Sequence, residues 1–128
     1  MDPLLEAAFA ARENAHAPYS GFFVGAAVEC DDGRVFGGCN IESASYGLTC
    51  CAERTAVFAA VAAGAKRFRR MAVATAAPRI TPPCGACRQM LWDLCGDLEI
   101  LLGNQQGDTV VYQLSQLFPE PFDAKSLA

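Results

Sequence analysis

The sequence predicts an α/β domain of three layers, α/β/α, in which a mixed five-stranded sheet lies between helices. Helical and extended segments alternate along most of the chain, a pattern typical of a sheet with both faces covered. Two extended runs flank Asp31-Asp32-Gly33, which is a hairpin turn signal and predicts an antiparallel pair at one edge. With 128 residues, the chain has the size of one domain, and we expect residues 1–128 to fold as a single unit.

The first helix is expected to begin at Asp2 and Pro3. Asp2 can cap the first turn, and proline at the first helical position has no N–H to lose. Apolar residues follow at helical spacing until Pro18 ends the run. Residues 24–30 and 34–40 then read as the two strands of the hairpin.

In the second half of the chain, glycine and proline residues mark the boundaries between the predicted helices and strands. A helix is predicted over 51–63 with Gly64 as its stop, and a short apolar strand over 71–77. Pro82-Pro83 breaks the chain before a helix over 84–95, which Gly96 ends. Strands are predicted over 98–102 and 109–113, and Ser115 is a candidate cap for a short helix ending at Pro119.

The composition argues against several classes of function. Hydrophobic residues make up 52% of the chain and charged residues 19%, so a packed core is expected. The net charge of -4 does not favour binding to phosphate backbones, and we expect no nucleic-acid partner. The longest uncharged apolar stretch, near 55–65, is too short for a membrane span. Met1-Asp2-Pro3 lacks the basic start of a secretory signal, so a cytoplasmic location is expected.

Seven cysteines are present, an odd number that cannot pair completely within one chain. Structural disulfides are rare in the reducing cytosol. We therefore expect a mixture of metal ligands and small buried thiols.

Three of these cysteines have the spacing of a metal site. Cys84 and Cys87, in Pro83-Cys84-Gly85-Ala86-Cys87, share one face of a helix start and can bind one ion. Cys51 begins the other predicted helix, in Cys51-Ala52-Glu53. Together the segments match the zinc-deaminase pattern His-x-Glu…Pro-Cys-x-x-Cys, with cysteine in the histidine position. Three protein ligands on a tetrahedral Zn²⁺ leave one position open for water, which is typical of a catalytic site.

Two neighbours of Cys51 have candidate roles. Glu53 is close enough to accept a proton from a metal-bound water and deliver it to a substrate. Three thiolates and Zn²⁺ sum to a charge of -1, and the guanidinium of Arg54 would offset it by donating to ligand sulfurs. The competing interpretations are a solvated acid in a first helical turn for Glu53 and a surface cation for Arg54.

The cysteine pattern also fits two plainer kinds of site. A lone Cys-x-x-Cys occurs as a redox pair, although the upstream Cys-Ala-Glu would then be a coincidence. A structural zinc would need a fourth ligand, for which His16 and Cys50 are the candidates. Cys50 adjoins Cys51, but a neighbour one position along a helix points about 100° away.

Five motifs make the sequence similar to a known family. They are Ala17-Pro18-Tyr19-Ser20, Val24-Gly25-Ala26-Ala27, Gly38-Cys39-Asn40-Ile41-Glu42, Cys51-Ala52-Glu53-Arg54-Thr55-Ala56 and Pro83-Cys84-Gly85-Ala86-Cys87-Arg88-Gln89. In this order they closely resemble the small, homotetrameric, zinc-dependent cytidine deaminases. The resemblance extends from about residue 17 to residue 122, which is most of the chain.

The resemblance implies the fold, the reaction and the roles of individual residues. The fold would be cytidine deaminase-like, and the reaction would convert cytidine or deoxycytidine and water to the uridine counterpart and ammonia, usually in pyrimidine salvage. By resemblance, one Zn²⁺ per subunit is held by Cys51, Cys84 and Cys87, with Glu53 as proton shuttle. The substrate-binding positions implied are Asn40 and Glu42 for the ribose hydroxyls, Phe22 beside the pyrimidine, the Ala52 backbone at the base, and Phe122 in a neighbouring subunit's site.

Several of these positions have plainer interpretations. Phe22 could be core, since Phe23 beside it could equally be the inward residue. Asn40 and Glu42 could belong to an ordinary loop after the hairpin, and Phe122 could merely anchor the C-terminal tail. Tyr46 is expected at a subunit contact, and Trp92 in the core or an interface. The basic run 66–70 is expected to be a solvated stretch between helix and strand.

Three other functions compete with nucleoside deamination. A blasticidin deaminase shares the zinc signature but does not account for Asn40-Ile41-Glu42 as a ribose-binding pair. A nucleic-acid deaminase is disfavoured by the acidic balance and the lack of added loops. A non-catalytic zinc or redox module would leave Glu53 and the open coordination position without a purpose.

Overall fold

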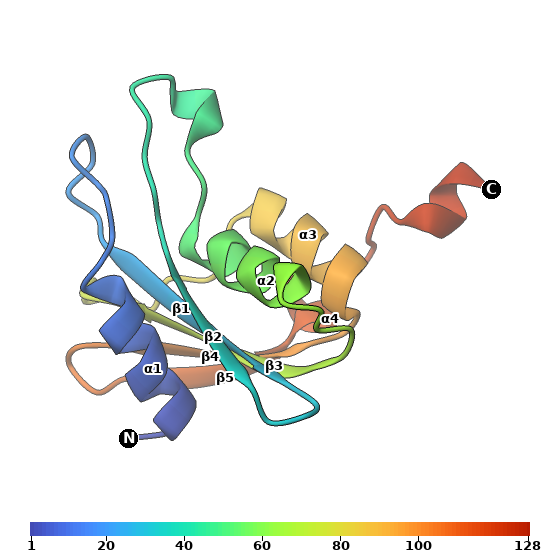
Figure 1. Cartoon of the computed structure of the whole chain (residues 1–128), viewed down its shortest axis with the longest axis horizontal. Coiled ribbons are helices and arrows are strands. Elements are labelled where there is room, and N and C mark those ends of the chain that lie inside the picture. Colours follow the sequence, from blue (N-terminus) through green and yellow to red (C-terminus); the bar gives the residue numbers. More distant parts are fainter.

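The computed structural model describes residues 1–128 and contains one mixed five-stranded sheet, as the sequence predicts (Figure 1). The strands are β1 (Val24–Cys30), β2 (Val35–Cys39), β3 (Phe68–Thr75), β4 (Glu99–Asn104) and β5 (Thr109–Gln113), in the spatial order β2-β1-β3-β4-β5. The helices are α1 (Pro3–Arg12), α2 (Ala52–Ala62), α3 (Gly85–Cys95) and α4 (Leu114–Leu117), with 3₁₀ turns at Tyr46–Leu48 and Ala124–Leu127. β3 and β4 are parallel, and the other neighbouring strands are antiparallel.

Alternating side chains give the sheet two apolar faces, each covered by helices. Ala26 and Val28 of β1 belong to the cluster that contains α2 and α3 residues, whereas Ala27 between them faces α1. α1 lies on one side of the sheet, and α2 and α3 lie on the other (Figure 1). Alanines at 27, 72 and 74 form much of the α1 face, so this helix can approach closely. The three-layer α/β/α architecture is confirmed.

Glycine determines where α2 packs and where it ends. A Cβ on Gly38 of β2 would overlap the backbone at Ala56, so only glycine lets α2 pack this close to the strand. Gly64 has φ +92°, a left-handed conformation that ends the helix as predicted. These contacts hold the N-terminus of α2, with Cys51 as its N-cap, near the sheet.

The first helix is shorter than predicted, since it ends at Arg12 instead of continuing towards Pro18. The following segment pairs with the end of β2. The backbone N–H of His16 donates to Asn40 O at 2.9 Å, and the N–H of Glu42 donates to His16 O at 2.8 Å. These long-range bonds take the backbone groups that a longer helix would have used.

The basic run 66–70 is exposed at Lys66, Arg67 and Arg69, but the expectation of a solvated stretch is wrong for Arg70, whose side chain is only 23% exposed. β3 begins at Phe68, earlier than predicted, so Arg69 and Arg70 lie within the strand. The Arg70 guanidinium donates to both carboxylate oxygens of Asp2, at 2.7 and 3.0 Å, and to Glu29 at 3.4 Å. Asp2 also caps α1 by accepting from the N–H of Leu4 at 2.8 Å. Asp2 therefore joins the first helix to the middle of the sheet.

This arrangement predicts a loss of stability when Asp2 is changed. Asp2→Asn keeps a cap but loses the ion pair, and we expect the unfolding free energy to fall by about 0.5–1 kcal/mol. Asp2→Ala loses both, and a fall of about 1–2 kcal/mol is expected. The hydrogen bond from Arg70 lowers the pKa of Asp2, so this stabilisation is present at neutral pH and fades as the pH falls below about 4. Urea denaturation at pH 7 and pH 3 measures the difference.

A matched control is Glu13→Gln, which neutralises an acid at the other end of the same helix where no ion pair is formed. Its effect should stay within about 0.5 kcal/mol. A pH-independent loss for Asp2→Asn would contradict the assigned ion pair.

The short helix near the C-terminus begins differently from the prediction. Gln113, not Ser115, is the N-cap of α4, and its backbone N–H donates to the side chain of Gln116 at 2.8 Å. Ser115 instead donates its backbone N–H to Asp97 at 2.7 Å. Trp92 packs edge-on against Phe118 and against the main core, which confirms its predicted packing. None of the helices has the length and apolar character needed to span a membrane.

Candidate functional site

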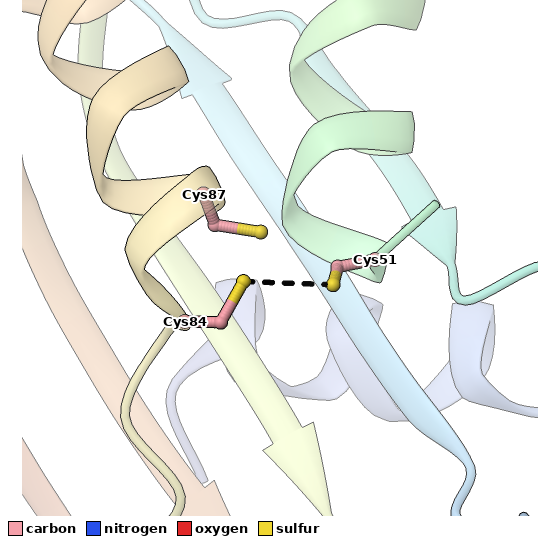
Figure 2. A group of neighbouring side chains, drawn as sticks. All are labelled: Cys51, Cys84 and Cys87. Carbon is pink, nitrogen blue, oxygen red and sulfur yellow. Dashed lines mark hydrogen bonds between the residues drawn. The ribbon is translucent and has the colours of Figure 1, made fainter. Parts of the chain in front are cut away.

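The cysteines of the motif lie at two helix starts that face each other. Cys51 is the N-cap of α2 and Cys84 is the N-cap of α3, both with extended backbone. Neither thiol caps its helix by a hydrogen bond. Cys87 lies in the first turn of α3 and is fully buried. All three sulfurs point into the space between the helix starts (Figure 2). The fold thus brings together residues that are 33 positions apart in the chain.

The sulfur positions fit a tetrahedral zinc ion. The three Sγ atoms lie within 4.8 Å of one another, and Sγ of Cys51 is 3.7 Å from Sγ of Cys84. Two thiolates at ~2.3 Å from one tetrahedral Zn²⁺ would be ~3.8 Å apart. No other histidine, cysteine or acidic residue joins this group. His16 and Cys50, the candidate fourth ligands, lie outside it, so the donor set matches an open three-ligand site better than a closed structural one.

The remaining cysteines form no disulfide. Cys30 is buried, and Cys39, Cys50 and Cys95 are partly buried, as expected for free thiols. Burial raises the pKa of Cys95 to about 12 and also raises the pKa of Cys50. These two thiols are therefore kept protonated at neutral pH.

Charge around the cluster favours a thiolate at Cys51. A hydrogen bond from Cys87 and, next, one from Arg54 lower the pKa of Cys51 to about 5 despite its partial burial. The Arg54 guanidinium donates through Nη2 to Sγ of Cys51 at 3.4 Å, and this bond raises the pKa of the arginine further. Nε of Arg54 is buried with no partner in the chain. The arginine is thus directed at the sulfur of Cys51 and is not a free surface cation.

Glu53 is buried beside the sulfurs, with 5% of its surface exposed. Burial raises the pKa of its carboxyl to about 7, against an opposing contribution from its own backbone N–H. A solvated acid in a first helical turn would show neither property. The side chain lines a cavity together with Cys51 and Cys84.

That cavity has a volume of about 270 Å³ and collects most of the substrate-binding positions named from the sequence. Phe22, Asn40, Glu42 and Ala52 all line it. Its other lining residues were not identified from the sequence, and they are Ser20, Val24, Thr49, Val73, Thr81 and Pro82. Ser20 and Val24 belong to motifs that pointed to the family, but the others carry no local signal.

Asn40 and Glu42 make hydrogen bonds to the loop that precedes β1. The Asn40 side chain accepts from the N–H of Val24 at 2.9 Å and donates to the carbonyl of Phe22 at 2.7 Å. The Glu42 carboxylate accepts from the N–H groups of Tyr19 and Ser20, at 3.0 and 3.1 Å, and from the Ser20 hydroxyl. Bonds from Ser20 thus lower the pKa of Glu42 and keep it ionised.

The two neighbouring phenylalanines occupy different places. Phe22 lines the cavity, with 40% of its surface exposed. Phe23 is outside the lining, and its carbonyl accepts from Nε of Arg12 at 2.8 Å. Hence Phe22 is the aromatic residue that faces the cavity.

Phe122 does not lie in this cavity. It is 58% exposed, and its carbonyl accepts from Nε2 of Gln89 at 2.7 Å. The C-terminal segment that follows it extends away from the sheet beyond α3 (Figure 1). Within one chain, therefore, Phe122 is separate from the residues around Glu53.

Comparison with known proteins agrees with this geometry. Residues 2–100 match the model of the cytidine and deoxycytidylate deaminase zinc-binding region. The chain is 49% identical to a cytidine deaminase of Halalkalibacterium halodurans over 97% of its length and 95% of the relative. It is 40% identical to a cytidine deaminase of Sporosarcina psychrophila, covering 100% of the chain and 95% of the relative.

A solved structure shows the same fold. The crystal structure of cytidine deaminase from Burkholderia pseudomallei superposes with a TM-score of 0.90 and 52% identity, over 93% of this chain and 96% of that one. With its three converging thiols and its buried glutamate, the chain belongs to the zinc-binding cytidine and deoxycytidylate deaminase family.

Proposed function

We propose that the protein catalyses zinc-dependent hydrolytic deamination of cytidine and deoxycytidine to uridine and deoxyuridine, with release of ammonia. One observation carries the proposal: a buried glutamate lies beside three converging thiols in a cavity that Asn40 and Glu42 also line. The relatives at 40–49% identity over nearly the whole chain are named cytidine deaminases.

Cys51, Cys84 and Cys87 would hold one Zn²⁺ per subunit. When bound, Zn²⁺ supplies a water molecule whose pKa is lowered towards ~7. The ion and three thiolates carry a net charge of -1, and the Arg54 guanidinium next to Cys51 offsets it.

Glu53 is the proposed general acid and base. Its carboxylate takes a proton from the attacking water and delivers it to N3 of the pyrimidine while the oxygen adds to C4. The same carboxyl then transfers the second water proton to the amino group, which leaves as ammonia. Atoms balance, since cytidine and water give uridine and ammonia. Burial from bulk water supports this role.

The sugar and base would be held by groups on the same cavity wall. Asn40 and Glu42 are proposed to bind the ribose hydroxyls, Phe22 to contact the pyrimidine face, and the Ala52 backbone at the start of α2 to contact the base. Asn40 keeps one amide proton after its two bonds to the loop, and the Glu42 carboxylate keeps acceptor capacity after its three. Holding C4 over the cluster is a positioning contribution to the rate.

The test is a spectroscopic assay of cytidine and deoxycytidine conversion, with zinc measured in the same sample. We expect turnover of both nucleosides in proportion to zinc content. Blasticidin S and a cytidine-containing oligonucleotide serve as alternative substrates. Turnover without zinc dependence, or of either alternative in preference to the nucleosides, would overturn the proposal.

We also propose a homotetramer whose sites lie at subunit interfaces. Large apolar side chains are exposed near the cavity, including Tyr46 at 76% and Leu48 at 74%. Tyr46 stacks edge-on with Tyr19, which is itself 52% exposed. Exposed aromatic groups of this kind are typical of protein interfaces. Phe122 on its extended tail is proposed to enter the cavity of a neighbouring subunit.

Phe122→Ala is expected to raise KM for cytidine by about tenfold, since an aromatic contact with the base is worth about 1–1.5 kcal/mol. Zinc content should be unchanged. Leu127→Ala, also exposed on the tail but beyond Phe122, is the matched control and should leave KM unchanged. Sedimentation of both variants checks that the assembly survives. An unchanged KM for Phe122→Ala in an intact tetramer would contradict the shared site.

We propose a location and a biological role on the basis of the same family relationship. A single domain spanning residues 1–128 would act in the cytoplasm on free nucleosides, in pyrimidine salvage. Neither nucleic acid nor membrane is a proposed partner.

A further inference from the structure

The loop between Ala17 and Val24 forms one wall of the cavity, but it is not held there by burial. Tyr19, Phe22 and Phe23 are exposed to 52%, 40% and 39%. The loop contains no regular secondary structure between α1 and β1. Its position must therefore depend on the few hydrogen bonds that reach it from elsewhere.

One of those bonds comes from Nε of Arg12, which donates to the carbonyl of Phe23 at 2.8 Å, and the others come from the two residues proposed to bind the ribose. Asn40 holds the carbonyl of Phe22 and the N–H of Val24. Glu42 holds the N–H groups of Tyr19 and Ser20. The segment after β2 thus carries both the sugar-binding groups and the support of the aromatic wall.

Ser20 connects these two parts. Its hydroxyl donates to the Glu42 carboxylate and accepts from the N–H of Phe22 at 3.0 Å. The hydroxyl proton and one acceptor site are both used, so the serine links Glu42 directly to the backbone of Phe22. Ser20 itself lines the cavity.

We propose that Ser20 is a positioning residue that couples the sugar-binding carboxylate to the aromatic wall. This inference rests on the proposed nucleoside substrate. Ser20 keeps one Glu42 oxygen oriented and keeps the Phe22 backbone at a set distance from it. Without the hydroxyl, Oε2 of Glu42 loses its donor and the N–H of Phe22 loses its acceptor, and only the bonds to Oε1 still hold the carboxylate. The substrate would then bind to a less preorganised wall, and ordering that wall would weaken the binding of sugar and base together.

Because the bond runs to a charged group, Ser20→Ala is expected to lower kcat/KM for cytidine by about tenfold to a hundredfold. Most of the change should appear in KM, since Ser20 does not touch the reacting atoms. Zinc content and melting temperature should stay close to those of the unmodified enzyme. Ser20→Thr retains the hydroxyl and should recover most of the activity.

A matched control is Ser43→Ala. This serine is close to Glu42 in the chain, but its hydroxyl accepts from the N–H of Ser45 at 3.0 Å and does not contact the Glu42 carboxylate. Its removal should leave KM within about twofold.

A double-mutant cycle with Glu42→Gln separates coupling from general loosening. If Ser20 acts through Glu42, Ser20→Ala should have a clearly smaller effect on KM in the Glu42→Gln background. If the two substitutions acted independently, so that their fold-changes in KM multiplied in the double variant, the proposal would be overturned. So would a loss confined to kcat, or a Ser20→Ala variant with unchanged KM in an enzyme that deaminates cytidine. Absence of cytidine turnover in the unmodified protein would instead refute the proposed function itself.

Discussion

Glu53→Gln is expected to lower kcat for cytidine by about three to four orders of magnitude while zinc remains bound. Glutamine has nearly the size of glutamate, so the buried position next to Cys51 can still be filled. However, the amide cannot accept the proton from water or return it to the leaving amino group. Single-turnover kinetics with zinc measured in the same sample give the result.

Glu6→Gln is the matched control, because Glu6 is also an acid in a first helical turn but is exposed. It should retain full activity and zinc. A Glu53→Gln enzyme that turned cytidine over near the unmodified rate would remove Glu53 from the mechanism. Loss of zinc in that variant would instead show that the carboxylate supports the metal site.

Replacement of Cys84 by alanine is the change with the second largest expected effect. Two thiolates remain, and we expect the zinc content to fall from one ion per subunit to below about 0.1 after dialysis against a chelator. Activity should be lost with the metal. Since Cys84 is exposed, the alanine creates no large internal cavity, and the fold should survive. Zinc analysis and circular dichroism separate loss of metal from loss of structure.

Cys50→Ala provides the corresponding control. Cys50 adjoins a proposed ligand in the chain but is not part of the thiol group, and burial keeps it protonated. Zinc content and activity should be close to those of the unmodified enzyme. The opposite pattern, with zinc lost on replacing Cys50 and kept on replacing Cys84, would show that the ligand set is wrong.

Local signals in the sequence were sufficient for most of the elements. Asp2 and Pro3 mark the start of α1, Gly64 and Gly96 mark the ends of α2 and α3, and the extended runs predict all five strands. These signals act within a few residues, through capping bonds and allowed backbone angles, so they can be recognised without tertiary structure.

The predicted ends of two elements are wrong where the backbone pairs with a segment distant in the sequence. α1 stops at Arg12 because His16 pairs with the end of β2. β3 begins at Phe68 because the backbone there pairs with β1, with Phe68 opposite Cys30 and Arg70 opposite Glu29. Nothing near these positions in the sequence indicates such partners, so the local pattern of the basic run predicts a solvated stretch.

For the site, the sequence alone determined the chemistry of the donor set. Two cysteines three apart after a proline pair and a third before an alanine and a glutamate indicate a metal and a proton carrier, because ligand type and helical spacing are local properties. Tertiary structure decided how these residues meet in space. It places the sulfurs of Cys51 and Cys84 3.7 Å apart and buries Glu53 beside them. It also places Phe22, and not Phe23, in the lining of the cavity. It also decided that Asn40 and Glu42 support the loop before β1, since hydrogen bonds across more than fifteen positions follow from packing and not from spacing.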